Sequence, residues 1–199
     1  GQSTLFIASS YSGNTEETIS ALKQAIEIGC KIVCITTGGE VESIAKLNKI
    51  PCVKVQPGFQ PRYSLGLSFF SLLKVFQELK LISDQTKVVE KIISLWKQKG
   101  IEYSKDGNFA YTFAEPLIGF IPVIYSVADS TSAVGYRFKC QLNENSKLHA
   151  FHNEIPEMNH NEIIGWESYQ EKVFHSKIIN IIDDTYHPQI QKRFEILKD

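Results

Sequence analysis

Three hydroxyl side chains and a glycine lie within six residues near the start of the chain. They are Ser10, Ser12, Gly13 and Thr15, in the stretch SSYSGNTEET. An apolar, β-prone run precedes the stretch and apolar residues at helical spacing follow it, so we expect strand, loop and helix in that order. The free N–H groups and the positive dipole end of the helix would then face the hydroxyls, an arrangement that binds a phosphate monoester. The alternative is that these residues only cap the helix.

A carboxylate and an imidazole lie sixteen residues apart in the second half of the chain. Glu144 belongs to KCQLNENSK and His160 to IPEMNHNEIIGW, and asparagines that could orient them lie beside both. An aldose–ketose interconversion needs such a pair, because one group opens the sugar ring and the other carries a proton between C1 and C2. The alternative is a solvated glutamate with a core or surface histidine, and an isolated pair of this kind would favour that alternative.

Other titratable residues near this pair are weaker candidates. Glu157 and Glu162 flank His160 and could orient it. His149 and His152 lie three residues apart, a spacing found in metal sites, but no further ligand pattern completes a site. We therefore expect no metal and no organic cofactor.

The composition is that of an ordinary globular protein. Its 199 residues include 21 Lys plus Arg and 22 Asp plus Glu, which gives a net charge of -1. That charge creates no field to attract nucleic acid or an anionic membrane, so we expect neither as a partner. The four cysteines form no CxxC pair, and no apolar run approaches the roughly 18–20 residues of a membrane span. We expect reduced thiols and a cytoplasmic protein.

Strand and helix patterns alternate along the chain. The expected strands cover residues 4–8, 31–36, the region of Val53, 121–127 and 178–182. The expected helices cover residues 15–28, 41–47, 65–81, 84–99, 108–117, 131–143 and a segment after Pro188. Such alternation predicts the α/β class, with parallel sheets covered by helices in two halves, the first of them incomplete. We place the domain boundary between residues 82 and 83.

Several motifs resemble one known family. SYSGNTEET is similar to the phosphate loop of the sugar isomerase (SIS) domain. NENSK, PEMNHNEIIGW, GYRFKCQLNEN and PRYSLG around Arg62 resemble the bifunctional phosphoglucose/phosphomannose isomerase family, and the resemblance covers nearly the whole chain. It implies two SIS-type halves of three-layer αβα architecture, flavodoxin-like or Rossmann-like. Residues 1–82 would form a partial first SIS domain with the phosphate loop, and residues 83–199 a second SIS-like domain with the acid/base residues.

The resemblance also implies a role for each candidate residue. The 6-phosphate would be held by the hydroxyls of Ser10, Ser12 and Thr15. Arg62 would stabilise the negative charge of the enediolate, Glu144 would move the proton between C2 and C1, and His160 would open the ring. In this family the histidine comes from the neighbouring subunit, so a homodimer with a shared active site is implied.

The expected function is therefore the interconversion of glucose 6-phosphate and fructose 6-phosphate. Mannose 6-phosphate is a second candidate for the aldose. Two alternatives remain: a regulator that only binds a phosphosugar through its SIS domain, and an isomerase of another phosphosugar. A regulator would lack the acid/base pair and would often carry a basic helix-turn-helix, which the sequence does not show. The family's glycine-rich N-terminal segment and its C-terminal lysine segment have no counterpart in the 199 residues, so we expect a piece of a longer protein.

Overall fold

The computed structural model describes residues 1, 3–168 and 173–197. The chain divides into two compact units, Gly1–Ser94 (unit 1) and Leu95–Asp199 (unit 2). The division falls inside helix α4 (Thr86–Tyr103), whereas the sequence pattern places a boundary at residues 82 and 83, in the connection before that helix.

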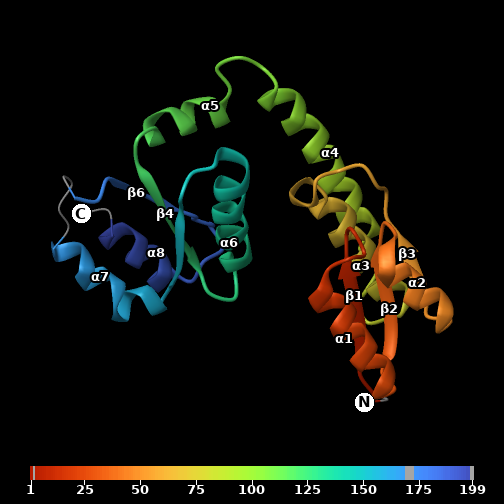
Figure 1. The fold of residues 1–199 in the computed structure, drawn as a ribbon. Helices are drawn as coiled ribbons and strands as arrows, with labels where there is room; N and C mark the ends of the chain where they lie inside the picture. The colour runs from red at the N-terminus through yellow and green to blue at the C-terminus, as the bar shows by residue number, and fades with distance from the viewer. Residues whose placement is uncertain (2, 169–172, 198–199) are drawn as a thin grey trace. The chain divides into compact units, whose positions relative to one another are not determined.

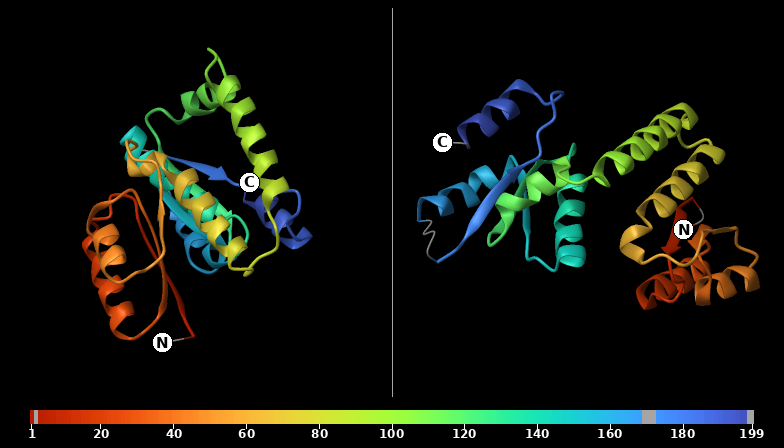
Figure 2. Two further views of the ribbon diagram at one scale, coloured as in Figure 1. Left: turned by 90° about the vertical axis from the view of Figure 1, so that its right-hand side faces the viewer. Right: turned by 90° about the horizontal axis from the view of Figure 1, so that it is seen from above.

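Unit 1 is built on a parallel three-stranded sheet in the order β1-β2-β3 (Figure 1). The strands are β1 (Leu5–Ser10), β2 (Lys31–Thr36) and β3 (Cys52–Lys54). The helices are α1 (Glu16–Glu27), α2 (Gly39–Leu47) and α3 (Leu65–Glu78), with a 3-10 turn at Pro61–Tyr63. Ala8 and Cys34 on one face of the sheet pack with Leu22 of α1 and Val41 of α2. The alternate residues point to the other face, on the side of α3, so the unit has three layers (Figure 2, left).

Unit 2 is built on a second parallel sheet, in the order β5-β4-β6. The strands are β4 (Ile121–Val127), β5 (Phe151–Ile155) and β6 (Ser176–Asn180). The helices are α5 (Phe109–Ala114), α6 (Ser132–Gln141), α7 (Glu162–Gly165) and α8 (Pro188–Ile196); 3-10 turns cover Glu115–Leu117, Glu157–His160 and Trp166–Ser168, and a π-helical turn covers Leu142–Ser146. Tyr125 packs with Met158 and Phe194 on one face of the sheet. Ser126 points to the other face, against Gly135 of α6.

The α/β architecture with parallel sheets is confirmed, but several elements differ from the expectation in detail. Strand β6 covers Ser176–Asn180 rather than residues 178–182. Strand β5 was not expected: it lies at the sheet edge and three of its five residues are polar, so its sequence lacks the apolar run of a central strand. Strand β1 continues to Ser10, because Ser9 and Ser10 still pair with β2. Helix α6 ends at Gln141, and the π-helical turn that follows ends at Ser146, directly before Lys147, which has a φ of 55°.

All four cysteines are free thiols. Cys34 and Cys52 lie opposite each other on β2 and β3, and burial, with a smaller contribution from Cys52, raises the pKa of Cys34 to about 11. This thiol therefore stays protonated near neutral pH. Across the residues described, no helix combines the length and apolar character needed to cross a membrane.

Candidate active site

The hydroxyl-rich loop begins where β1 ends. Ser10 is only 5% exposed, and its Oγ lies 2.8 Å from Thr15 Oγ1 and accepts a hydrogen bond from the Gly13 N–H at 3.1 Å. Ser12 is exposed, and its Oγ accepts from the Asn14 N–H at 3.2 Å. The structure thus brings the hydroxyls of Ser10 and Thr15 together, while the Ser12 hydroxyl bonds within its own turn.

Helix α1 starts directly after this loop. Thr15 is the N-cap residue with an extended backbone, and within the described part of the chain no side chain caps this helix end. The first N–H groups of a helix have no partner inside the helix, so here they remain able to donate to an anion. Glu16 and Glu17 occupy the first turn, where their charge is favourable beside the helix dipole. The capping role considered from the sequence is therefore not what the Thr15 hydroxyl does.

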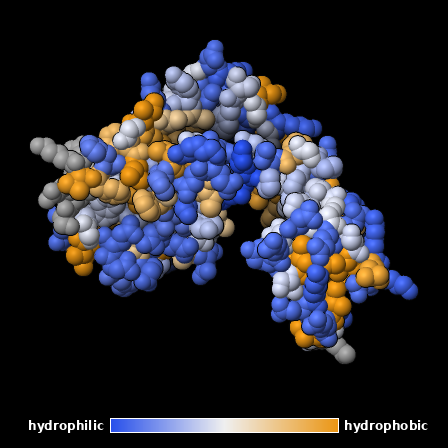
Figure 3. Space-filling view, viewed as in Figure 1, coloured by the Kyte–Doolittle hydropathy of each residue, from blue (hydrophilic) through white to orange (hydrophobic). Residues whose placement is uncertain are grey.

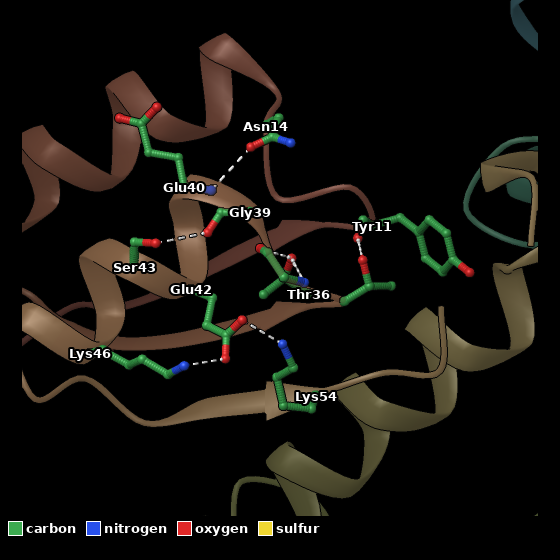
Figure 4. A network of polar contacts seen from close by, with 11 residues as sticks. Tyr11, Asn14, Thr36, Gly39, Glu40, Glu42, Ser43, Lys46 and Lys54 are labelled. Atoms are coloured by element: carbon green, nitrogen blue, oxygen red, sulfur yellow. Dashed lines mark hydrogen bonds and ion pairs between the residues drawn. The ribbon is translucent and has the colours of Figure 1, made fainter. Parts of the chain in front are cut away.

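The loop after β2 braces the hydroxyl-rich loop. Val41 N–H donates to the carbonyl of Gly13 at 2.9 Å, and Glu40 N–H donates to Asn14 Oδ1 at 3.0 Å, as Figure 4 shows for the second bond. Gly13 has a φ of +73°, and a Cβ added there would lie 1.8 Å from the carbonyl oxygen of Gly38. Only glycine fits this position, because both the backbone conformation and the contact exclude a side chain.

Arg62 lies in the 3-10 turn that follows β3. It is half-buried, and its Cζ lies 5.1 Å from the centre of the Tyr63 ring. The segment that leads to it is bound by Tyr11, whose hydroxyl accepts from the Phe59 N–H and donates to the Gln56 carbonyl, each at 2.9 Å. The loops after β1 and β3 are therefore in direct contact at the carboxyl edge of the sheet, where parallel α/β sheets bind ligands. Sequence analysis gave Tyr11 no role.

A second cation at the end of β3, Lys54, is already paired with a carboxylate. Lys54 Nζ lies 2.6 Å from Glu42 Oε2, and Lys46 Nζ lies 2.8 Å from Glu42 Oε1 (Figure 4). Hydrogen bonds from Lys46 and then Lys54 lower the pKa of Glu42 to about 2, so the carboxylate stays ionised. Lys54 is therefore a weaker candidate than Arg62 for stabilising an anionic substrate.

Glu144 lies on the π-helical turn between α6 and β5. It is exposed, and its carbonyl oxygen accepts from Lys147 Nζ at 2.6 Å. Asn143 Oδ1 accepts from the Ala150 N–H at 3.0 Å, which places the turn at the amino end of β5. The neighbouring Asn143 thus holds the turn in place, and π-helical turns are frequent at functional sites.

His160 lies beyond the opposite end of the same strand. It ends the 3-10 turn after β5 and is exposed, and the Glu157 carboxylate in this turn accepts from Asn161 Nδ2 at 3.1 Å. The five residues of β5 span roughly 17 Å. Within one chain, Glu144 therefore lies at the edge of the sheet formed by the amino ends of its strands, and His160 lies at the edge formed by their carboxyl ends.

Glu162 belongs to a partly buried hydrogen-bond network next to this turn. Its carboxylate accepts from the Tyr125 hydroxyl and from Asn153 Nδ2, each at 2.5 Å, and Trp166 Nε1 donates to the Tyr125 hydroxyl at 2.8 Å. Burial, followed by the bond to Glu162, raises the pKa of Tyr125, so the phenol stays a donor. Glu162 thus fastens α7 to strands β4 and β5, and its carboxylate is occupied by these bonds rather than by His160.

His152 is a residue of β5. Its Nε2 lies 2.6 Å from the buried Ser126 Oγ, and a Cβ on Gly135 would lie 2.5 Å from the same nitrogen. Burial lowers the pKa of His152, which favours the neutral imidazole. His149 lies just before the strand and is exposed. In the described ranges, no group of three or more His, Cys, Asp or Glu side chains is arranged to hold a metal ion.

Parallel α/β units with a hydroxyl-rich loop at a strand end fit the SIS-domain class, and the comparisons with known proteins show this class. Residues 106–199 match the family model of the bacterial phosphoglucose isomerase C-terminal SIS domain. Tagatose-6-phosphate ketose/aldose isomerase from Escherichia coli shares the fold with a TM-score of 0.63 at 18% identity, over 94% of this chain and 50% of that one.

Closer relatives are found by sequence. Bifunctional phosphoglucose/phosphomannose isomerases from Caldicellulosiruptor bescii and Aquifex aeolicus are 39% and 38% identical, over 98% and 95% of this chain. The chain belongs to this family. It spans 59% and 56% of the length of these two relatives.

Proposed function

We propose that the protein carrying this chain is an aldose–ketose isomerase that interconverts glucose 6-phosphate, and also mannose 6-phosphate, with fructose 6-phosphate. The observation that carries the proposal is the pair of hydroxyls, Ser10 and Thr15, at the uncapped start of α1. This arrangement suits the dianionic phosphate monoester of a hexose 6-phosphate. The names of the relatives from two organisms support the same substrates.

The chemistry needs no group beyond side chains. Glu144, as a carboxylate, takes the proton from C2 of the open-chain aldose and returns it to C1 of the enediolate, which yields the ketose. Arg62 stabilises the negative charge that develops on the enediolate oxygens. His160 moves a proton at the ring oxygen when the ring opens, because an imidazole can both donate and accept a proton. Ser12 supplies a third hydroxyl to the phosphate site when the substrate phosphate is bound in the loop.

Replacement of the assigned base tests the proposal. Glu144→Gln keeps the shape of the side chain but removes the proton acceptor, so kcat should fall roughly 10²–10⁴-fold while fructose 6-phosphate still binds. Exchange of the C2 proton with solvent, followed by NMR in deuterated buffer, should stop as well. Glu115→Gln, at an exposed carboxylate in the same unit, is the matched control and should keep wild-type exchange. Normal exchange by Glu144→Gln would show that another group is the base.

We further propose a homodimer in which each active site combines Glu144 of one chain with His160 of the other. The placement of these residues at opposite edges of one sheet supports a shared site. Exposed large hydrophobic residues are also visible on each unit (Figure 3). In unit 2, Ile118 is 76% exposed and Ile164 is 63% exposed. A two-fold interface could cover such residues.

Mixing two inactive variants tests the shared site. Glu144→Gln and His160→Ala should each lack activity, but a mixed dimer of the two would contain one site with both wild-type residues. After unfolding and refolding of an equal mixture, half of the dimers are mixed, so about a quarter of wild-type activity should return. Activity that stays at the level of the single variants would mean that both residues act from one chain.

Two alternatives give different results in the same assays. A regulator that only binds a phosphosugar would bind fructose 6-phosphate but would not exchange a C1 proton of this ketose, even as the wild type. An isomerase of another phosphosugar would exchange protons of its own substrate only. The four free thiols support a reducing, cytoplasmic location, where glycolysis and gluconeogenesis would supply and use these hexose phosphates.

A further inference from the structure

Tyr11 is the residue of the hydroxyl-rich loop that reaches furthest along the chain. Its side chain leaves the loop between Ser10 and Ser12 and contacts the segment 45–48 residues later. The phenol hydroxyl accepts from the Phe59 N–H and donates to the Gln56 carbonyl, both at 2.9 Å. The hydroxyl therefore uses its donor and an acceptor position on the backbone of one loop, which a phenylalanine could not do.

The backbone of the same residue holds a second loop. The carbonyl oxygen of Tyr11 accepts from the Thr37 N–H at 3.0 Å and from Thr37 Oγ1 at 2.7 Å. Figure 4 shows a dashed bond at the Tyr11 backbone, with the Tyr11 ring pointing away from Gly39. One residue thus joins the loops that follow β1, β2 and β3 at the carboxyl edge of the sheet.

The loop of residues 56–60, which binds the Tyr11 hydroxyl, has little regular structure of its own to fix its conformation. Residues 56–60 form no helix or strand, Gly58 has a φ of +100°, and Phe59 is 47% exposed. The turn that begins at Pro61 follows directly, so the backbone position at Phe59 determines where the Arg62 side chain starts.

We propose that Tyr11 is a positioning residue that fixes Arg62 relative to the bound phosphate, by fastening the Gln56–Phe59 backbone to the hydroxyl-rich loop. The proposal rests on the proposed function for the role of Arg62, while the fastening itself is a property of the loop. Misplacing a catalytic group by about 1 Å can cost up to ~10²-fold in rate, so loss of one hydroxyl is expected to be measurable.

Tyr11→Phe removes the hydroxyl and keeps the ring. In the native protein we expect kcat to fall about tenfold, with less than about a twofold change in KM for fructose 6-phosphate and in the Kd of inorganic phosphate. In the Arg62→Ala background, Tyr11→Phe should cause no further loss of kcat, because Tyr11 acts through Arg62. Tyr111→Phe, which removes an exposed hydroxyl in unit 2, is the matched control.

A second measurement does not depend on activity. Hydrogen exchange of the Phe59 amide, which donates to the Tyr11 hydroxyl, should be at least about tenfold faster in Tyr11→Phe, and amides in α1 should keep their wild-type rates. Unchanged exchange at Phe59 would overturn the proposal. So would equal losses of kcat from Tyr11→Phe in the wild-type and Arg62→Ala backgrounds. If the wild type shows no isomerase activity, the proposed function fails, and the exchange measurement still decides whether Tyr11 fastens the loop.

Discussion

The carboxyl edges of the two sheets are held in different ways. In unit 1 the loops bond to one another: Gly13 and Asn14 accept hydrogen bonds from the start of α2, and Tyr11 reaches the loop after β3. In unit 2 the exposed His160 lies on a turn, and the residues that follow it are anchored to Tyr125, which is completely buried in the strand below.

This difference predicts how a substitution in each region should affect the binding site and the exposed histidine. The hydroxyl-rich loop of unit 1 is shaped by contacts among its own residues and with the neighbouring loops, so a change there should distort the anion site directly. The His160 turn of unit 2 depends on polar bonds under the surface, so a change in those bonds should act on an exposed residue from a distance. Variants in each unit can separate these two behaviours.

Gly13→Ala should have the largest effect on stability. A left-handed φ costs an L-residue about 1–2 kcal/mol, and a forced contact in a packed site costs about 1–3 kcal/mol more. Because the Cβ would lie 1.8 Å from a backbone oxygen, we expect a loss near the upper end, about 3–5 kcal/mol. Urea unfolding with intrinsic fluorescence would measure the free energy, and calorimetry should show loss of phosphate binding.

Gly107→Ala is the control for the backbone term alone. Gly107 has a similar φ of +65°, but a Cβ there meets no atom within 4 Å. The loss in the free energy of unfolding for Gly107→Ala should therefore be only about 1–2 kcal/mol. Equal losses at both glycines would contradict the view that the loops of unit 1 are locked by contact.

Tyr125→Phe should have an intermediate effect. The substitution removes the hydrogen bond that the Tyr125 hydroxyl donates to Glu162 and the one that it accepts from Trp166 Nε1, which costs about 1–3 kcal/mol. If the network anchors the His160 turn, turnover of ring-form substrate should also slow, while inorganic phosphate binding stays unchanged. Chemical unfolding and titration calorimetry would test the two parts, with Tyr111→Phe as the control. Weakened phosphate binding would contradict the separation of the two regions.

The sequence predicted most elements because they follow simple patterns. The apolar runs at β2 and β4 and the helical spacing of α1 gave elements that match within one residue at each end. β5 was missed because FHNEI is an edge strand with few apolar residues. The π-helical turn was missed because LNENS continues the polar pattern of a helix end, and the backbone change depends on Lys147 adopting a positive φ.

Parts of the candidate site were also readable. Ser10 and Thr15 could be paired in advance, because a strand, a loop and a helix in sequence bring such residues to one end of a sheet. The contacts from the loop after β2 could not be predicted from the sequence. Gly38 and Gly39 indicate only a turn, and their close contact with Gly13 is apparent only in the structure. The bonds of the Tyr11 hydroxyl join residues 45 and 48 positions apart, and no local pattern reveals them.

The pH dependence contributed by His152 should be smaller than the Tyr125 effect. Its folded pKa lies below the usual 6.5, so the unfolded chain binds the proton more tightly and stability falls as the pH drops below about 6.5. Burial is the main cause; nearby Glu154 opposes it and Lys139 adds to it. His152→Gln should reduce the difference in melting temperature between pH 7.5 and pH 5.5 by roughly 2 °C. His149→Gln, at an exposed histidine, should leave that difference unchanged.

The smallest expected effect is at the surface of unit 1, where Glu42 binds Lys46 and Lys54. The pKa of Glu42 is lowered from 4.5 to about 2, so its contribution to stability is complete above about pH 4.5 and is lost as the pH falls toward 2. Glu42→Gln should lower the melting temperature at pH 7 by at most about 2 °C, and 1 M salt should remove most of that difference. Glu40→Gln, which breaks a single exposed pair with Lys23, should change it less. A larger decrease in melting temperature for Glu42→Gln that does not depend on salt would mean that this cluster determines the conformation of the loops and is not only a surface ion pair.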